Sequence, residues 1–197
     1  MGIQSEPPTI SFKTVLGIWV LSLILSLLIG LISPSIIQVS VLFSEVGLII
    51  PVFAFLRVKG LSIASAGLKN SGWFKSLMIG LVIGPSSYIA ALAVGQGVVF
   101  IWPPPQFYID ALKPLIPRSS TDLIVWFTIV AIFVGPCEEL LSRGFVQSNA
   151  ERRFGSLRGL ILASILFGLL HLDPWRSPGS AAAGLIIGYV YQKRNYS

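Results

Sequence analysis

Long apolar stretches are the feature of this sequence that most limits its fold. A run of roughly 20 residues with few charges is long enough to cross the hydrocarbon core of a bilayer. Such runs occur at residues 12–32, 36–56, 76–101 and 122–142, and shorter ones follow at 157–172 and 179–192. The pattern predicts an all-α, polytopic bundle of about six transmembrane helices.

The composition agrees with a membrane protein. Hydrophobic residues make up 54% of the chain and charged residues only 11%, whereas soluble domains carry about 25% charged residues. The first apolar run is too long for a secretory signal and has no evident cleavage site before the Ser33-Pro34-Ser35 turn, so we expect a permanent span. We interpret residues 1–10 as a polar tail and residues 11–197 as a single integral membrane domain.

The basic residues predict the orientation of the chain. With the amino terminus inside, eleven of the fourteen fall on the inner side. These are Lys13, Arg57, Lys59, Lys69, Lys75, Arg143, Arg152, Arg153, Arg158, Lys193 and Arg194. We therefore expect a multi-pass protein of a bacterial cytoplasmic membrane with both termini in the cytoplasm. The net charge of +6 is then a topology signal, and the expected partners include membrane lipid but no nucleic acid.

Charged side chains within the apolar runs indicate a functional site. Glu138, Glu139 and Arg143 end the fourth run, and the single histidine, His171, lies near the end of the next. A charge near the centre of a membrane helix costs about 2.5 to 3.5 kcal/mol, so these groups must face a protein interior or a wet cavity. Ionisable residues in such places usually serve function.

A helical hairpin would bring the two groups to one depth. Gly155 is a predicted helix stop. Glu138 lies 17 residues before it and His171 16 residues after it, which at 1.5 Å per residue gives about 25 Å down and about 24 Å back.

The two glutamates differ in their helical neighbours. Glu139 and Arg143 are spaced i, i+4 in the order that favours an ion pair. Glu138 shares its stripe with Ser142 and Phe145 and has no base at helical spacing, which makes it a candidate general base. The alternative is that both glutamates only tie neighbouring helices together.

The motifs Glu138-Glu139-x-x-x-Arg143 and Phe167-x-x-x-His171 resemble the first two motifs of the CPBP intramembrane protease family. That family includes CAAX prenyl endopeptidases and bacteriocin-immunity membrane proteins, and the resemblance covers about residues 130–192. It implies an endopeptidase that acts on a peptide or a prenylated membrane protein. Glu138 and His171 would activate the hydrolytic water, Glu139 and Arg143 would brace the site, and Phe167 is a candidate substrate-binding residue.

The sequence departs from the family in one respect. The family's next helix carries another histidine with asparagine or aspartate four residues later, and this chain reaches Ser197 without that motif. A catalytic zinc site takes three protein ligands and a water, so a zinc or other divalent ion implied by the resemblance has an incomplete ligand set here. Either the chain is truncated or the protein is a degenerate member of the family. Three functions stay open: an intramembrane peptidase, for which a metal-free water activated by Glu138 is one option, a non-hydrolytic immunity or scaffold protein that binds a peptide or partner in the same cavity, and an ion transporter.

Three further features have more than one interpretation. Glu45, in the middle of the second run, either lines the same cavity or bonds to a neighbouring helix. The proline- and aromatic-rich segment 102–121 is either a lid or a spacer at the interface. The single cysteine, Cys137, excludes an intramolecular disulfide and a multi-cysteine metal site.

Overall fold

The computed structural model describes residues 10–33, 36–62 and 73–195, and none of these forms a strand. The helices are α1 Phe12–Ile32, α2 Ile37–Val58, α3 Trp73–Ile101, α4 Gln106–Leu112, η2 Lys113–Leu115, α5 Ser120–Ile129, η3 Val130–Val134, α6 Gly135–Glu139, η4 Leu140–Gln147, α7 Ser148–Phe154, α8 Ser156–Leu169 and α9 Ser177–Asn195. The predicted tail up to residue 9, most of the predicted turn at 33–35, and Lys69 lie outside the described residues.

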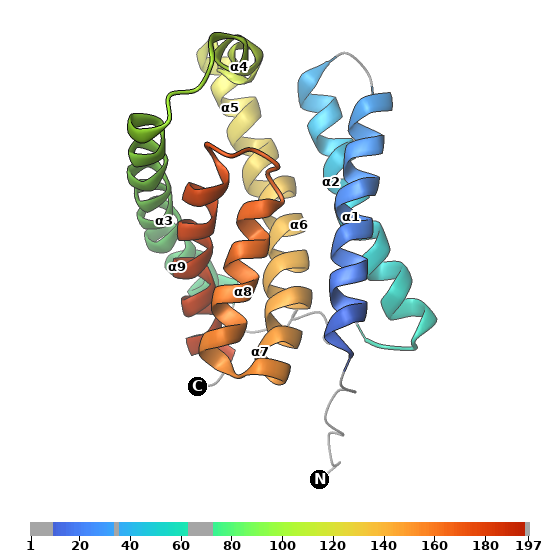
Figure 1. Ribbon diagram of the computed structural model, residues 1–197. Helices are drawn as coiled ribbons and strands as arrows, with labels where there is room; N and C mark the ends of the chain where they lie inside the picture. The colour runs from blue at the N-terminus through green and yellow to red at the C-terminus, as the bar shows by residue number, and fades with distance from the viewer. Residues whose placement is uncertain (1–9, 34–35, 63–72, 196–197) are drawn as a thin grey trace.

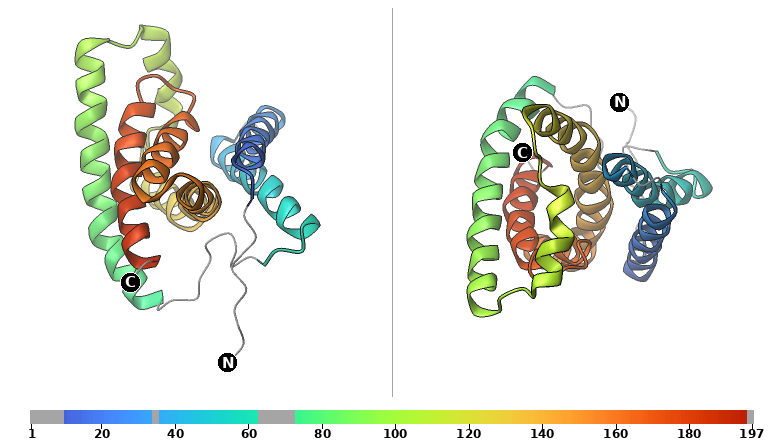
Figure 2. Two further views of the ribbon diagram at one scale, coloured as in Figure 1. Left: turned by 60° about the horizontal axis from the view of Figure 1, so that its bottom comes forward. Right: turned by 90° about the horizontal axis from the view of Figure 1, so that it is seen from above.

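The chain passes back and forth along the bundle as α1, α2, α3, the continuous helix from α5 to α7, α8 and α9 (Figure 1). Within the described residues, four helices are long and apolar enough to cross a membrane: Phe12–Ile32, Ile37–Val58, Met78–Ile101 and Ser120–Phe154. α8 is a shorter apolar helix. The predicted all-α membrane bundle is confirmed. The α1–α2 pair lies on one side of the α5–α7 helix, and α3, α8 and α9 lie on the other (Figure 2).

Local sequence explains where the helices begin. The Ser11 hydroxyl accepts a hydrogen bond from the Thr14 amide at 3.2 Å and caps α1. The Ser119 hydroxyl accepts from the Asp122 amide at 3.0 Å and caps α5 in the same way. Serine is favoured at this position because its oxygen satisfies an amide that has no partner within the helix.

The long helix is wound more widely at η3 and η4, on either side of the adjacent glutamates. Both are π-helical: the Gly135 amide bonds to the Val130 carbonyl and the Ser148 amide to the Arg143 carbonyl, each five residues back. Pro136 explains the first of these, since proline lacks an amide proton and its ring displaces the carbonyl four residues earlier. π-Helical turns of this kind are frequent at functional sites.

The hairpin between α7 and α8 depends on two glycines. Gly155, at a φ of 85°, ends α7 in a conformation that other residues rarely adopt, which confirms the predicted helix stop. At Gly159 the helices are so close that an added Cβ would lie 2.5 Å from the Glu151 backbone nitrogen. α8 therefore returns directly along the helix that carries the glutamates.

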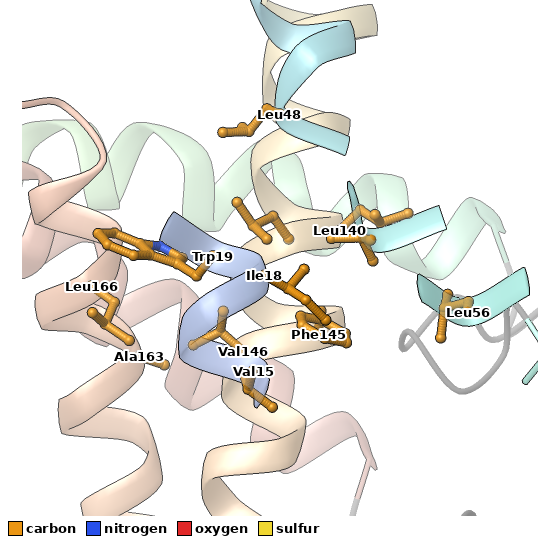
Figure 3. Packing of buried hydrophobic residues seen from close by; sticks show 12 residues of the cluster. Val15, Ile18, Trp19, Leu48, Leu56, Leu140, Phe145, Val146, Ala163 and Leu166 are labelled. Atoms are coloured by element: carbon orange, nitrogen blue, oxygen red, sulfur yellow. The ribbon is translucent and has the colours of Figure 1, made fainter. Parts of the chain in front are cut away.

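Buried apolar side chains connect the two sides of the bundle (Figure 3). Their contributors are α1, α2, η4 and α8, with Val15, Val52, Leu141, Phe145 and Ala163 fully buried. The outer faces of the spans keep large apolar side chains exposed, including Leu28, Phe100 and Phe127. Lipid would cover such faces in a membrane.

The two ends of the bundle differ in chemistry. The Phe12 and Phe154 rings meet at 5.0 Å, and the Gln192 amide donates to the Ser156 carbonyl at 2.8 Å. The start of α1, the α7–α8 turn and the end of α9 therefore share one end (Figure 1). The sequence predicted which basic residues lie on the inner side, and most of those that the structure describes are at this end. α4 and the α8–α9 loop form the opposite end (Figure 1).

Candidate active site

Arg143 is buried and contacts residues of both motifs. Its side chain is 1% exposed, and its Nε lies 3.3 Å from Glu139 Oε2, which confirms the predicted ion pair. The guanidinium carbon lies 4.7 Å from the centroid of the Phe167 ring on α8. None of its three nitrogens forms a hydrogen bond among the described residues. The Glu139 carboxylate and the face of the Phe167 ring thus compensate its positive charge at short range.

His171 lies just beyond α8 and folds back on Phe167. The two rings meet edge to face at 5.6 Å, and His171 Nδ1 lies 3.2 Å from the Phe167 carbonyl oxygen. Because a carbonyl oxygen can only accept, this contact requires the proton on Nδ1 and leaves Nε2 as the acceptor nitrogen. The next residue, Leu172, has a φ of 47°, an uncommon conformation for a bulky side chain that turns the chain away after the histidine.

The structure connects the two motifs, but through residues other than the expected Glu138–His171 pair. Glu139 pairs with Arg143, Arg143 covers Phe167, and Phe167 contacts His171. No hydrogen bond or ion pair among the described residues joins Glu138 directly to His171. Phe167 is buried beneath Arg143, and its role in substrate binding stays a prediction.

Glu138 faces acidic and basic neighbours on several elements. It interacts electrostatically with Glu139 and Arg143 on its own helix and with Arg176 in the α8–α9 loop. Glu45 on α2 interacts with both Glu138 and Cys137. Of the two interpretations of Glu45, the structure therefore favours the one that places it beside the same site. Its Oε2 atom is buried and has no hydrogen-bond partner among the described residues.

The winding of η4 modifies the predicted stripe. Ser142 and Phe145 are fully buried in the protein, whereas Glu138 is half-buried. The three residues therefore differ in burial, and the wider turns of η4 mean that side chains at i, i+4 and i+7 do not align as they would on a straight α-helix.

The segment 102–121 contacts the residues that follow His171. Tyr108 donates to Asp173 Oδ2 at 2.5 Å, and the Trp175 indole donates to the Trp102 carbonyl at 2.9 Å. The Trp175 and Tyr108 rings also pack against each other at a tilt of 44°, with their centroids 4.5 Å apart. Burial, and then the bond to Asp173, raises the pKa of Tyr108 to about 12. These contacts favour a lid over a free spacer. The aromatic content of the segment is evident in the sequence, whereas the Tyr108–Asp173 pair joins residues that are distant in it.

A buried polar network lies near the end of the bundle that holds the α7–α8 turn, and it was not predicted from the sequence. The Gln147 amide donates to Glu151 Oε1 at 2.6 Å and to the Gly188 carbonyl at 2.9 Å, and Gln192 donates to the same Glu151 oxygen at 2.8 Å. The network ties α9 to the helix that carries the glutamates. Its sequence signal is the i, i+4 spacing of Gln147 and Glu151.

A metal ion needs several donor side chains that converge on one point. Among the described residues, no group of three His, Cys, Asp or Glu side chains is placed to hold a metal. Catalytic zinc takes three protein ligands, so the described donors do not fit the ion that the family resemblance implies.

Comparison with known proteins gave one match. Residues 120–196 match the model of a family described as Type II CAAX prenyl endopeptidase Rce1-like. No curated protein and no solved structure matches the chain. The matched segment begins at α5 and includes both motifs, whereas Glu45 and Tyr108 lie before it. This segment is therefore similar to the Rce1-like family, which agrees with the resemblance predicted from the motifs.

Proposed function

We propose that the protein is an intramembrane endopeptidase of the CAAX protease type that hydrolyses a peptide bond with a water activated by Glu138. One observation carries the proposal: buried Arg143 links the glutamate motif to Phe167 and His171 on the returning helix. The Rce1-like match over the same segment supports it.

The proposed chemistry needs only groups of this chain. Glu138 takes a proton from water, and the resulting hydroxide attacks the carbonyl carbon of the peptide bond. As the carbon–nitrogen bond breaks, the proton passes to the leaving amine. His171 Nε2 accepts a hydrogen bond from the water and orients it. Glu139 and Arg143 are positioning residues, and no step uses a metal.

We infer that the end formed by the start of α1 and the α7–α8 turn faces the cytoplasm of a bacterial cell. The basic residues at this end support the orientation, because cytoplasmic loops carry an excess of lysine and arginine. A prenylated or membrane-bound peptide would then enter the site laterally from the bilayer.

Cleavage of a fluorescent prenylated peptide by the purified protein in liposomes tests the proposal. Glu138→Gln and His171→Ala each remove a proton-transfer group, so we expect the rate to fall by a factor of about 10² to 10⁴. Asp110→Asn, which changes an exposed carboxylate on α4, should leave the rate unchanged. Cleavage that survives in both site variants would refute the catalytic assignment.

A second candidate is a non-hydrolytic protein that binds a peptide or partner protein in the same cavity, in an immunity or scaffold role. The incomplete metal donor set among the described residues favours it. It predicts that the wild type retains the prenylated peptide without cleaving it, and that a Glu138→Ala, His171→Ala double variant keeps any cellular phenotype.

A further inference from the structure

A pocket of about 670 Å³ opens between the start of α1 and the end of α7, away from the candidate active site. Three cations line it: Lys13 from α1, and Arg152 and Arg153 from α7. None of its lining residues is acidic. Arg152 is held in place because its Nε donates to the Ser148 carbonyl at 3.0 Å. The pocket therefore has the charge to receive an anion.

Apart from Ser11 and Asn149, the remaining wall is apolar, and it leads into the membrane-spanning surface. The Phe12 and Phe154 rings meet edge to face at 5.0 Å and close one side. Leu16 lines the pocket and begins a row with Val20 and Ile24, one helical turn apart, whose side chains are 39%, 41% and 47% exposed. This row continues from the pocket along the outer face of α1.

The depth of the pocket matches the boundary of the bilayer. It lies where the span Phe12–Ile32 begins and the span Ser120–Phe154 ends. A soluble anion would use the cations alone. A phospholipid would place its phosphate among the cations and an acyl chain along the apolar row.

We propose that this pocket binds an anionic phospholipid of the adjacent leaflet. The head-group phosphate contacts Lys13, Arg152 and Arg153, since arginine presents paired donors that suit phosphate oxygens. One acyl chain lies along Leu16 and the residues that follow it on α1. The site is independent of the proposed peptidase activity.

Native mass spectrometry of the full-length protein, with equal amounts of phosphatidylglycerol and phosphatidylcholine of the same chain length, tests the proposal. We expect one tightly held phosphatidylglycerol per protein. Each cation near a membrane surface contributes roughly a five-fold preference for anionic lipid, so Lys13→Gln with Arg153→Gln should weaken retention by about 25-fold. The matched control is Arg57→Gln with Lys59→Gln, which removes two exposed cations outside the pocket and should keep the bound lipid.

Each other result overturns the proposal. Equal loss in the two double variants would mean general surface attraction rather than a site. Equal retention of the two lipids would mean that no anion is recognised. Displacement by millimolar inorganic phosphate alone would identify a soluble anion as the ligand, because the acyl chain would then contribute nothing.

Discussion

The buried ion pair at the centre of the candidate site makes a quantitative prediction. Glu139→Gln removes the only carboxylate that the described residues place within salt-bridge distance of Arg143, which is 1% exposed. Loss of one partner from a buried pair costs about 3 to 5 kcal/mol because a charge is left uncompensated. The Glu139 side chain is still 38% exposed, and Glu138 also attracts Arg143, so we expect the lower end, about 3 kcal/mol of unfolding free energy.

Removal of both charges should restore much of that loss. The double variant Glu139→Gln, Arg143→Met leaves an uncharged side chain against Phe167, and such replacements of a buried pair are often neutral. We therefore expect the double variant to be more stable than Glu139→Gln alone, with a coupling energy of about 2 kcal/mol.

The assay is unfolding in mixed micelles by increasing sodium dodecyl sulfate, followed by fluorescence of the five tryptophans. Asp110→Asn is the control, because it breaks the exposed pair with Lys113 and should change stability little. Additive losses in the double variant would refute the reasoning, since Glu139 and Arg143 would then contribute independently.

Two further predictions concern the hairpin and the lid. Gly159→Ala should lower stability by about 1 to 3 kcal/mol, because the added Cβ would meet the Glu151 backbone. Gly80→Ala is the control and should not lower stability, because no described atom lies within 4 Å of the added Cβ. The same unfolding assay compares the two variants. One tyrosine should titrate near pH 12 by absorbance at 295 nm, and Asp173→Asn should move that pKa toward the ordinary value of 10.0. Since the folded-state pKa of Tyr108 is the higher one, its contribution to stability is constant below pH 10 and falls as the pH rises toward 12.

Hydropathy and motif spacing were sufficient to predict the four long spans, the helical hairpin and the Glu139–Arg143 pair. A run of apolar residues is a local property, and its length alone determines whether it can cross a membrane. Gly155 ends a helix through its own backbone freedom, and an i, i+4 pair meets on any helix. These features need no knowledge of distant parts of the chain.

The remaining features required the tertiary structure. Glu45 lies more than ninety residues before Glu138 in the sequence, and only the packing of α2 against the long helix brings them together. The lid over the α8–α9 loop and the basic pocket at the start of α1 likewise join distant segments. The widened η3 and η4 turns changed the direction of side chains that a regular helix would have fixed. Local sequence thus determined which segments are helices and which of them can enter a membrane, whereas the packing of one helix on another decided which charges and rings meet, because those contacts depend on the position of every helix at once.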